Sequence, residues 1–259
     1  MSTVYYNLPD VRIRYESSQK ETQTYSLHAI RLFQQYVLGQ YGGLAIAKYL
    51  PQMGHDSFFS VASTGLGKTV GVPGHVYLKH CEKVLKDIEP RQTLFRNIPR
   101  VWVVEPKITI AQAQEKEMNL HFSNFVASRN NSYDPKNPVL FGCKTAIDNI
   151  NPYAPIVFCT TGIFDIYARL GRFNPDIDHI IIDEAHVCIE ASENMELAIA
   201  ICRENGILID YLSATVDTAN LKETLKVSHV VRAIEERKPI WIHNVGASME
   251  ESIVDLVGK

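Results

Sequence analysis

The sequence lacks the features that mark membrane-spanning, secreted and disulfide-stapled proteins. Its 259 residues contain no run of 18 apolar residues, and the N-terminus has no signal-peptide profile. The five cysteines form no CxxC pair and show no zinc-ligand spacing, so reduced thiols in a core are favoured over disulfides. These absences predict a cytoplasmic protein with no membrane segment.

An excess of charge of either sign is also missing, as are internal repeats and low-complexity tracts. The formal net charge is −3, so a nucleic acid would have to meet a local surface rather than a basic field over the whole molecule. A hydrophobic content of 46% and a charged content of 21% are ordinary for a globular chain. The length suits one large α/β domain or two small ones.

Short apolar runs alternate with helical patterns along most of the chain. Such alternation predicts a doubly wound parallel sheet with helices on both faces, whose ligands bind beyond the carboxyl ends of the strands. Residues 89–99 are expected to be a polar loop. The predicted core strands cover residues 58–61, 101–105, 156–159, 179–182 and 207–212, with a short edge strand at 139–142. The predicted helices cover about 68–88, 111–125, the residues up to 170, and 192–205.

The first 50 residues are predicted to form an N-terminal extension. A strand pair is expected at residues 4–6 and 11–15, followed by a polar linker over 16–23 and a helix. That helix carries an apolar stripe formed by Ile30, Phe33, Tyr36, Val37 and Tyr41. Aromatic residues at this spacing indicate a core face rather than a base-stacking platform.

The residues after the first apolar run form a candidate phosphate-binding loop that opens a helix. Glycines leave room for a phosphate, the backbone amides point at it, and a Lys-Thr pair begins the helix. Lys68 would reach the β- and γ-phosphates of ATP, and the Thr69 hydroxyl would bind Mg²⁺. The alternative is a chance glycine-rich turn. The predicted nucleotide-binding residues are Ser63, Thr64, Gly65, Leu66, Gly67, Lys68 and Thr69.

An Asp-Glu-Ala-His tetrapeptide follows the fourth core strand, and its Asp183 lies 115 residues after Lys68. Asp183 could hold Mg²⁺, usually through water, and Glu184 could orient or deprotonate the attacking water. An acidic pair at a strand end is common, but this tetrapeptide is rarer and its order after the loop adds weight. We therefore predict Lys68, Asp183 and Glu184 as catalytic residues and Thr69, Asp183 and Glu184 as metal ligands.

Five segments in order resemble the motifs of the DEAH/DExH branch of superfamily 2 helicases. Residues 62–69 are similar to motif I, with Pro73 four residues beyond Thr69, and residues 183–186 are similar to motif II. The other segments are Glu105-Pro106-Lys107, Thr160-Thr161-Gly162 and Ser213-Ala214-Thr215, which resemble motifs Ia, Ib and III. Val187 and Cys188 after the box look closer to helicases of positive-strand RNA viruses, which would place the protein in the host-cell cytoplasm.

The resemblance implies a RecA-like P-loop NTPase domain that hydrolyses ATP with Mg²⁺ and acts on single-stranded RNA, or on DNA. It implies that His186, Ser213 and Thr215 couple the nucleotide site to the nucleic acid, although His186 could be an ordinary hydrogen-bonded histidine. It also implies phosphate and sugar contacts from Pro106, Lys107, Thr160, Thr161 and Gly162. For these residues the alternative is a set of ordinary strand-to-helix caps.

The same resemblance divides the chain into an extension at 1–50, a RecA-like ATP-binding domain at 51–235 and the start of a second RecA-like lobe at 236–259. The sequence has no Gln-x-x-Gly-Arg-x-Gly-Arg segment, which such a second lobe carries. We therefore expect a fragment, or one piece of a polyprotein, that is weakly active without its second lobe. Two other functions stay open. One is a DExH translocase on duplex DNA, and the other is a non-catalytic nucleotide-binding scaffold, against which the intact lysine and acidic residues argue.

Overall fold

The computed structural model describes most of the predicted elements. The described residues are 12–16, 22–25, 27–41, 58–62, 68–85, 93–95, 99–129, 140–152, 154–190, 193–214, 225, 227 and 229–233. The predicted strand at 4–6, the loop residues 63–67, Thr215 and the region 236–259 lie outside the described residues.

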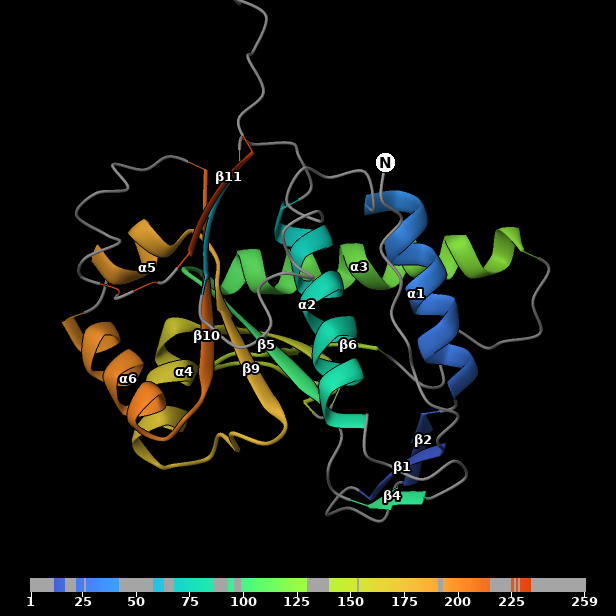
Figure 1. The fold of residues 1–259 in the computed structure, drawn as a ribbon, viewed down its shortest axis with the longest axis horizontal. Helices are drawn as coiled ribbons and strands as arrows, with labels where there is room; N and C mark the ends of the chain where they lie inside the picture. The colour runs from blue at the N-terminus through green and yellow to red at the C-terminus, as the bar shows by residue number, and fades with distance from the viewer. Residues whose placement is uncertain are drawn as a thin grey trace, which may run out of the picture.

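Among the described residues, eight strands form a central sheet, and the predicted core strands lie inside it (Figure 1). Neighbouring strands are parallel except β6 and β7, which are antiparallel. The prediction of a parallel sheet covered by helices is therefore confirmed. In spatial order the strands are β11 (His229–Ala233), β3 (Phe58–Ala62), β10 (Leu208–Ser213), β9 (Asp178–Ile182), β5 (Arg100–Glu105), β8 (Ile156–Thr160), β6 (Phe141–Lys144) and β7 (Asn149–Ile150).

Two apolar cores, one on each face of the sheet, hold the helices in place. Along β5 the side chains alternate between them: Val101 and Val103 enter the first core, and Trp102 and Val104 enter the second. Because both faces are buried, the central strands appear in the sequence as continuous apolar runs. The first core includes α1 (Leu27–Tyr41), α2 (Lys68–Leu85) and α3 (Ile108–Ser128), and the second includes α4 (Thr161–Arg169), α5 (Ala185–Glu190) and α6 (Glu193–Glu204).

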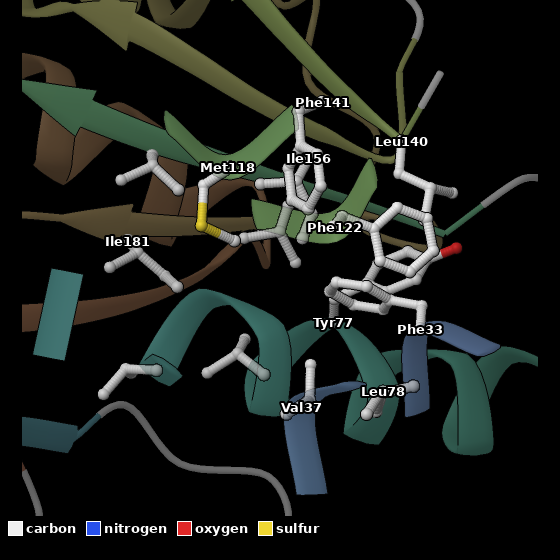
Figure 2. Packing of buried hydrophobic residues seen from close by; sticks show 14 of the residues in the cluster. Phe33, Val37, Tyr77, Leu78, Met118, Phe122, Leu140, Phe141, Ile156 and Ile181 are labelled. Atoms are coloured by element: carbon white, nitrogen blue, oxygen red, sulfur yellow. The ribbon is translucent and has the colours of Figure 1, made fainter. Parts of the chain in front are cut away.

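The aromatic residues of α1 belong to the first core, as predicted. Phe33 is fully buried, and its ring lies 5.9 Å from Tyr77, 5.8 Å from Phe122 and 5.7 Å from Phe141, measured between ring centroids (Figure 2). All three rings meet it edge to face, the geometry that aromatic quadrupoles favour. Tyr36 is buried beside it. These rings are therefore packed inside the protein and are closed to bases.

A single glycine allows α1 to pack closely on α2. A Cβ built on Gly74 would lie 2.8 Å from Val37 Cγ2, closer than side-chain carbons approach. The preceding residue, Pro73, lies inside α2 without ending it, although proline removes one hydrogen bond of the helix ladder. The helix thus passes through the Pro-Gly pair, as predicted, and keeps Lys68 at its first position.

A small second sheet corrects two predictions about the N-terminal half of the chain. It contains β1 (Arg12–Glu16), β2 (Thr22–Tyr25) and β4 (Thr93–Phe95), in the order β2-β1-β4. The predicted linker at 16–23 was wrong at its end, where β2 begins, and the predicted loop at 89–99 contains β4. Both strands are short, and β4 forms by pairing with residues some 80 positions away, which leaves no local pattern. The division at residue 50 stays a prediction.

The cysteines are reduced and buried, as the sequence predicted. All five cysteines are free and buried, and burial raises the pKa of Cys81 to about 12, so this thiol is an unreactive core group. Within the described part of the chain, no helix combines the length and the apolar content that crossing a bilayer requires.

A buried histidine lies beneath the amino end of the sheet. The Nε2–H group of His80 donates to the carbonyl oxygen of Ile177 at 2.6 Å. Burial, and then the neighbouring His179, lowers the pKa of His80 to about 4. His179 is itself engaged, because its Nε2–H donates to Asp210 at 2.6 Å. The fold therefore holds His80 neutral.

We expect this histidine to make stability depend on pH. Because the folded-state pKa lies below the unfolded value, the unfolded chain binds the extra proton, and stability is lost as pH falls from about 6.5 toward 4. Between pH 7 and pH 5 the wild type should lose about 2 kcal/mol more unfolding free energy than His80→Gln, whose amide donates without titrating. Urea denaturation at both pH values measures this. His121→Gln, at an exposed position of α3, is the matched control, and equal losses in all three proteins would contradict the assignment.

Candidate nucleotide site at the carboxyl rim of the sheet

The carboxyl ends of the parallel strands bring the predicted site residues to one rim. Lys68 begins α2 beyond β3, Asp183 and Glu184 follow β9, and Ser213 ends β10. Val104 of β5 pairs with Ile182 of β9, and the next residues along the two strands, Glu105 and Asp183, therefore lie side by side. Residues far apart in the sequence therefore become neighbours because parallel strands end at the same edge.

Lys68 and Glu184 form the central contact of this site. The Lys68 ammonium donates to Glu184 Oε1 at 2.8 Å across 116 positions of sequence. The Lys68 side chain is only 5% exposed, whereas that of Glu184 is 31% exposed. A buried cation at the positive N-terminus of a helix is unfavourable unless an anion faces it. The start of α2 therefore favours an anion next to Lys68, and in this structure that anion is the Glu184 carboxylate.

Asp183 is held beside the start of α2. It is buried, it accepts a hydrogen bond from Thr69, and its Oδ1 accepts another from the Glu184 amide at 2.8 Å. Burial raises the pKa of Asp183, while the Thr69 hydrogen bond and the Lys68 charge oppose the rise. A hydroxyl and a carboxylate oxygen at one point are hard donors of the kind that Mg²⁺ prefers.

Glu184 has an unusual backbone conformation. Its φ is +43°, in the left-handed region that non-glycine residues rarely adopt. Such a conformation costs on the order of 1–3 kcal/mol and is concentrated at functional sites. Here it turns the chain from β9 into α5, so that Asp183 faces Thr69 while Glu184 faces Lys68. No feature of the sequence indicates this turn.

His186, the last residue of the tetrapeptide, links α5 to β10. The His186 Nδ1 atom lies 2.7 Å from Ser213 Oγ, a hydrogen bond between α5 and the end of β10. The same nitrogen lies 3.8 Å from Glu184 Oε2. Lys68, Glu184, His186 and Ser213 therefore form a continuous polar chain through the site.

Glu105, which the sequence placed only within a motif, also belongs to this site. It is 1% exposed, and its Oε1 has no hydrogen-bond partner among the described residues. Burial, followed by the charges of Asp183 and Glu184, raises the pKa of Glu105, and Lys68 opposes the rise. Three acidic side chains thus share one lysine. The Thr69 and Asp183 oxygens and the acidic excess suit a divalent cation held partly through water and phosphates, although among the described residues no three acidic or histidine side chains are placed to hold an ion by themselves.

The predicted nucleic-acid residues lie at the starts of two neighbouring helices. Glu105 pairs with Thr160, so α3 and α4 begin side by side beyond β5 and β8. Lys107 and Thr160 are the N-cap residues, and neither side chain caps its helix by a hydrogen bond. The N-cap side chain therefore does not occupy the first amides of either helix. Lys107 and Gly162 are exposed, Pro106 and Thr161 are half-buried, and Thr160 is buried.

The architecture and the family comparison agree. A mostly parallel sheet covered on both faces, with a lysine-led helix and an acidic pair at its carboxyl rim, defines the RecA-like domain of helicases. A family model for the DEAD/DEAH box helicase matches residues 44–224, which is more than half of the chain. The chain belongs to the DEAD/DEAH box helicase family. Comparison with curated protein sequences finds no match.

Solved structures of similar fold include helicases of both the DEAD and the DEAH type. The DEAD-box helicase Mss116, bound to ssRNA and UDP-BeF, has a TM-score of 0.56 and 14% identity, over 88% of this chain and 48% of its own. Escherichia coli HrpB, a DEAH/RHA helicase, has a TM-score of 0.53 and 17% identity, over 83% and 26%. S. cerevisiae Dbp5, in a complex with Nup159, Gle1, IP6 and ADP, has a TM-score of 0.51 and 13% identity, over 79% and 52%.

At these sequence identities the similarity shows the fold alone, and the matched region is only part of each solved chain. The chain spans about half of the Mss116 and Dbp5 structures and about a quarter of the HrpB structure.

Proposed function

We propose that this chain is the first RecA-like, ATP-binding lobe of an ATP-dependent RNA helicase of the DEAH/DExH branch. The observation that carries the proposal is the 2.8 Å contact between Lys68 at the start of α2 and Glu184 after β9. The contact brings a lysine and a carboxylate together at the rim, which supports a phosphate-binding role for Lys68 and a water-handling role for Glu184. The Asp-Glu-Ala-His order supports the DEAH assignment.

In this proposal each residue of the rim has a distinct task. Lys68 contacts the β- and γ-phosphates, and Thr69 and Asp183 would hold Mg²⁺, which when bound neutralises charge on those phosphates. Glu184 orients and deprotonates the water that attacks the γ-phosphate. Because Lys68 now pairs with Glu184, phosphate binding has to exchange one anion for another at Lys68. That exchange frees the Glu184 carboxylate for the water.

We propose that His186 and Ser213 connect hydrolysis to movement. Their hydrogen bond joins the helix after motif II to the end of β10, and His186 lies next to Glu184. If a phosphate displaces Glu184 from Lys68, the surroundings of His186 change. His186 is hydrogen-bonded to Ser213, so the change reaches the end of β10. Thr215, two residues beyond Ser213, would share this role.

We also propose that turnover requires a second RecA-like lobe. In related phosphoryl-transfer systems, arginines from a second element contribute about 10³–10⁵ in kcat. The site described above supplies a lysine and carboxylates but no arginine among the described residues. The chain alone should bind nucleotide weakly, hydrolyse it slowly and fail to separate strands. Val187 and Cys188 after the box support a positive-strand RNA virus type, acting in the host-cell cytoplasm.

Single-stranded RNA is the proposed nucleic-acid partner, and its backbone would lie across the starts of α3 and α4. Lys107 is exposed and unengaged as a cap, and the Thr161 and Gly162 amides open α4 beside it. Amides, hydroxyls and a lysine read phosphates and sugars rather than bases. Binding should therefore tolerate many sequences.

The RNA assignment is tested by replacing Lys107. Lys107→Ala should weaken binding of two unrelated single-stranded RNAs equally and reduce the slope of log K against log salt by about 0.7, the loss of one phosphate contact. Fluorescence anisotropy at several salt concentrations measures both effects. Lys116→Ala removes an exposed lysine farther along α3 and is the control.

An unchanged slope in Lys107→Ala would contradict the proposed RNA path. The two rival functions have their own signatures in the two-lobed protein. Stimulation of ATP hydrolysis by duplex DNA and not by single-stranded RNA would indicate the translocase. Nucleotide binding without any hydrolysis would indicate the scaffold.

A further inference from the structure

Glu105 and Asp183 lie side by side on the sheet face that α2 covers. Val101 and Val103 of β5 and Ile181 of β9 all enter the first core, so by strand alternation Glu105 and Asp183 point to the same face. The pairing of Val104 with Ile182 makes them lateral neighbours on adjacent strands. Helix α2 begins there with Lys68 and Thr69.

The surroundings of Glu105 do not explain its presence as a packing residue. Its Oε1 is buried without a hydrogen-bond partner among the described residues, and the nearest charges are two carboxylates and one ammonium. That ammonium already bonds to Glu184 at 2.8 Å. An unpaired buried carboxylate destabilises a fold, so a glutamine or an apolar residue would suit a purely structural role better.

We propose that the Glu105 carboxylate positions Mg²⁺ by accepting hydrogen bonds from water in its hydration shell, next to Asp183. This inference rests on the proposed function of the site. Mg²⁺ dehydrates reluctantly and keeps several waters when it binds through one or two carboxylates and substrate phosphates. Those waters need acceptors, and a buried carboxylate beside Asp183 provides one at the required place. Glu105 is then a positioning residue for the cation and contacts no reacting atom.

The cation supplies what the metal-free site lacks. A divalent charge beside Asp183 would offset the excess of acidic side chains, and a water held by that ion would satisfy the unpartnered oxygen of Glu105. The same carboxylate thus destabilises the metal-free protein and strengthens metal binding. A residue with a structural role would give the opposite result for stability.

Binding of Mn²⁺ together with ADP tests the inference without any turnover. The signal of free Mn²⁺ in electron paramagnetic resonance gives the dissociation constant for the wild-type chain and for Glu105→Gln. The variant should bind Mn²⁺ with ADP about 10- to 100-fold more weakly, the usual effect of losing an outer-shell partner. Its binding of ADP in EDTA should be unchanged, and its melting temperature in EDTA should rise at neutral pH.

Two further variants make the result specific. Glu115→Gln changes another buried glutamate, on α3, whose side chain already bonds to Asn119, and should leave Mn²⁺ binding unchanged. Glu105→Asp keeps the charge but withdraws it by one methylene, and should give an intermediate affinity.

The outcomes separate this inference from the proposed function. A Glu105→Gln protein that binds Mn²⁺ with ADP as the wild type does would overturn the inference alone. A variant that unfolds in EDTA would identify Glu105 as a structural group and would overturn it as well. A folded wild-type chain that binds no ADP, with or without metal, would overturn the proposed function and this inference with it.

Discussion

Glu184→Gln is expected to lower kcat for ATP hydrolysis by about 10²-fold or more in a protein that carries the proposed second lobe, while nucleotide still binds. Glutamine keeps the shape of the side chain and its hydrogen bonds but cannot take a proton from water. It also reduces the contact with Lys68 from an ion pair to a hydrogen bond with a neutral amide, which a phosphate displaces more easily. Affinity for ATP should therefore be equal or higher. Single-turnover kinetics with a separate binding titration measures the two effects.

The matched control for this variant is Glu190→Gln. Glu190 ends α5, the short helix that begins directly after Glu184, and is exposed, so its charge can be removed without touching the rim. Its hydrolysis rate should equal that of the wild type. A kcat for Glu184→Gln close to the wild-type value would place the base elsewhere.

Lys68→Ala is expected to weaken nucleotide binding by about 10²-fold and to remove hydrolysis. Truncating one partner of a buried, hydrogen-bonded charge pair has a cost of this size, since the other charge is left without compensation. In Lys68→Ala the phosphates lack their positive partner when nucleotide is bound, and the acidic residues lack theirs when nucleotide is absent. Isothermal titration with Mg²⁺ and ADP measures the binding term.

The fold should survive this substitution, because Glu184 is 31% exposed and water can solvate it. Lys79→Ala, in the same helix, removes a partly exposed lysine whose partner Glu82 lies 3.5 Å away and provides the control. Circular dichroism shows whether Lys68→Ala folds. Near-normal turnover by the folded variant would contradict the assignment of Lys68.

Most of the fold could be predicted because its strands are buried on both faces. The strands β3, β5, β8, β9 and β10 carry mainly apolar residues toward both faces, which is the pattern of a covered parallel sheet. The strands β2, β4 and β7 and the helix α5 were missed. Each is six residues or shorter, which gives a periodic pattern little room, and β4 forms by pairing with β1 some 80 positions away.

The site was predictable where spacing and residue type determine it. The order of the motifs predicted that Lys68 and the acidic pair share one rim, and the family resemblance implied that His186 couples to Ser213 or Thr215. The structure brings Lys68 to Glu184 and His186 to Ser213. The position of Glu105 beside Asp183 was not predictable, because it depends on the register of β5 with β9 and on the sheet face toward which each side chain points. The roles of these residues stay predictions, and Ser63 to Gly67 and Thr215 lie outside the described residues.

The most direct test of the account is a crystal structure of the chain with ADP and Mg²⁺ bound. We predict that the β-phosphate lies at the start of α2, that Lys68 Nζ has moved from Glu184 to a phosphate oxygen, and that the ion lies between Thr69 and Asp183. A nucleotide bound elsewhere, with the 2.8 Å contact between Lys68 and Glu184 intact, would contradict it.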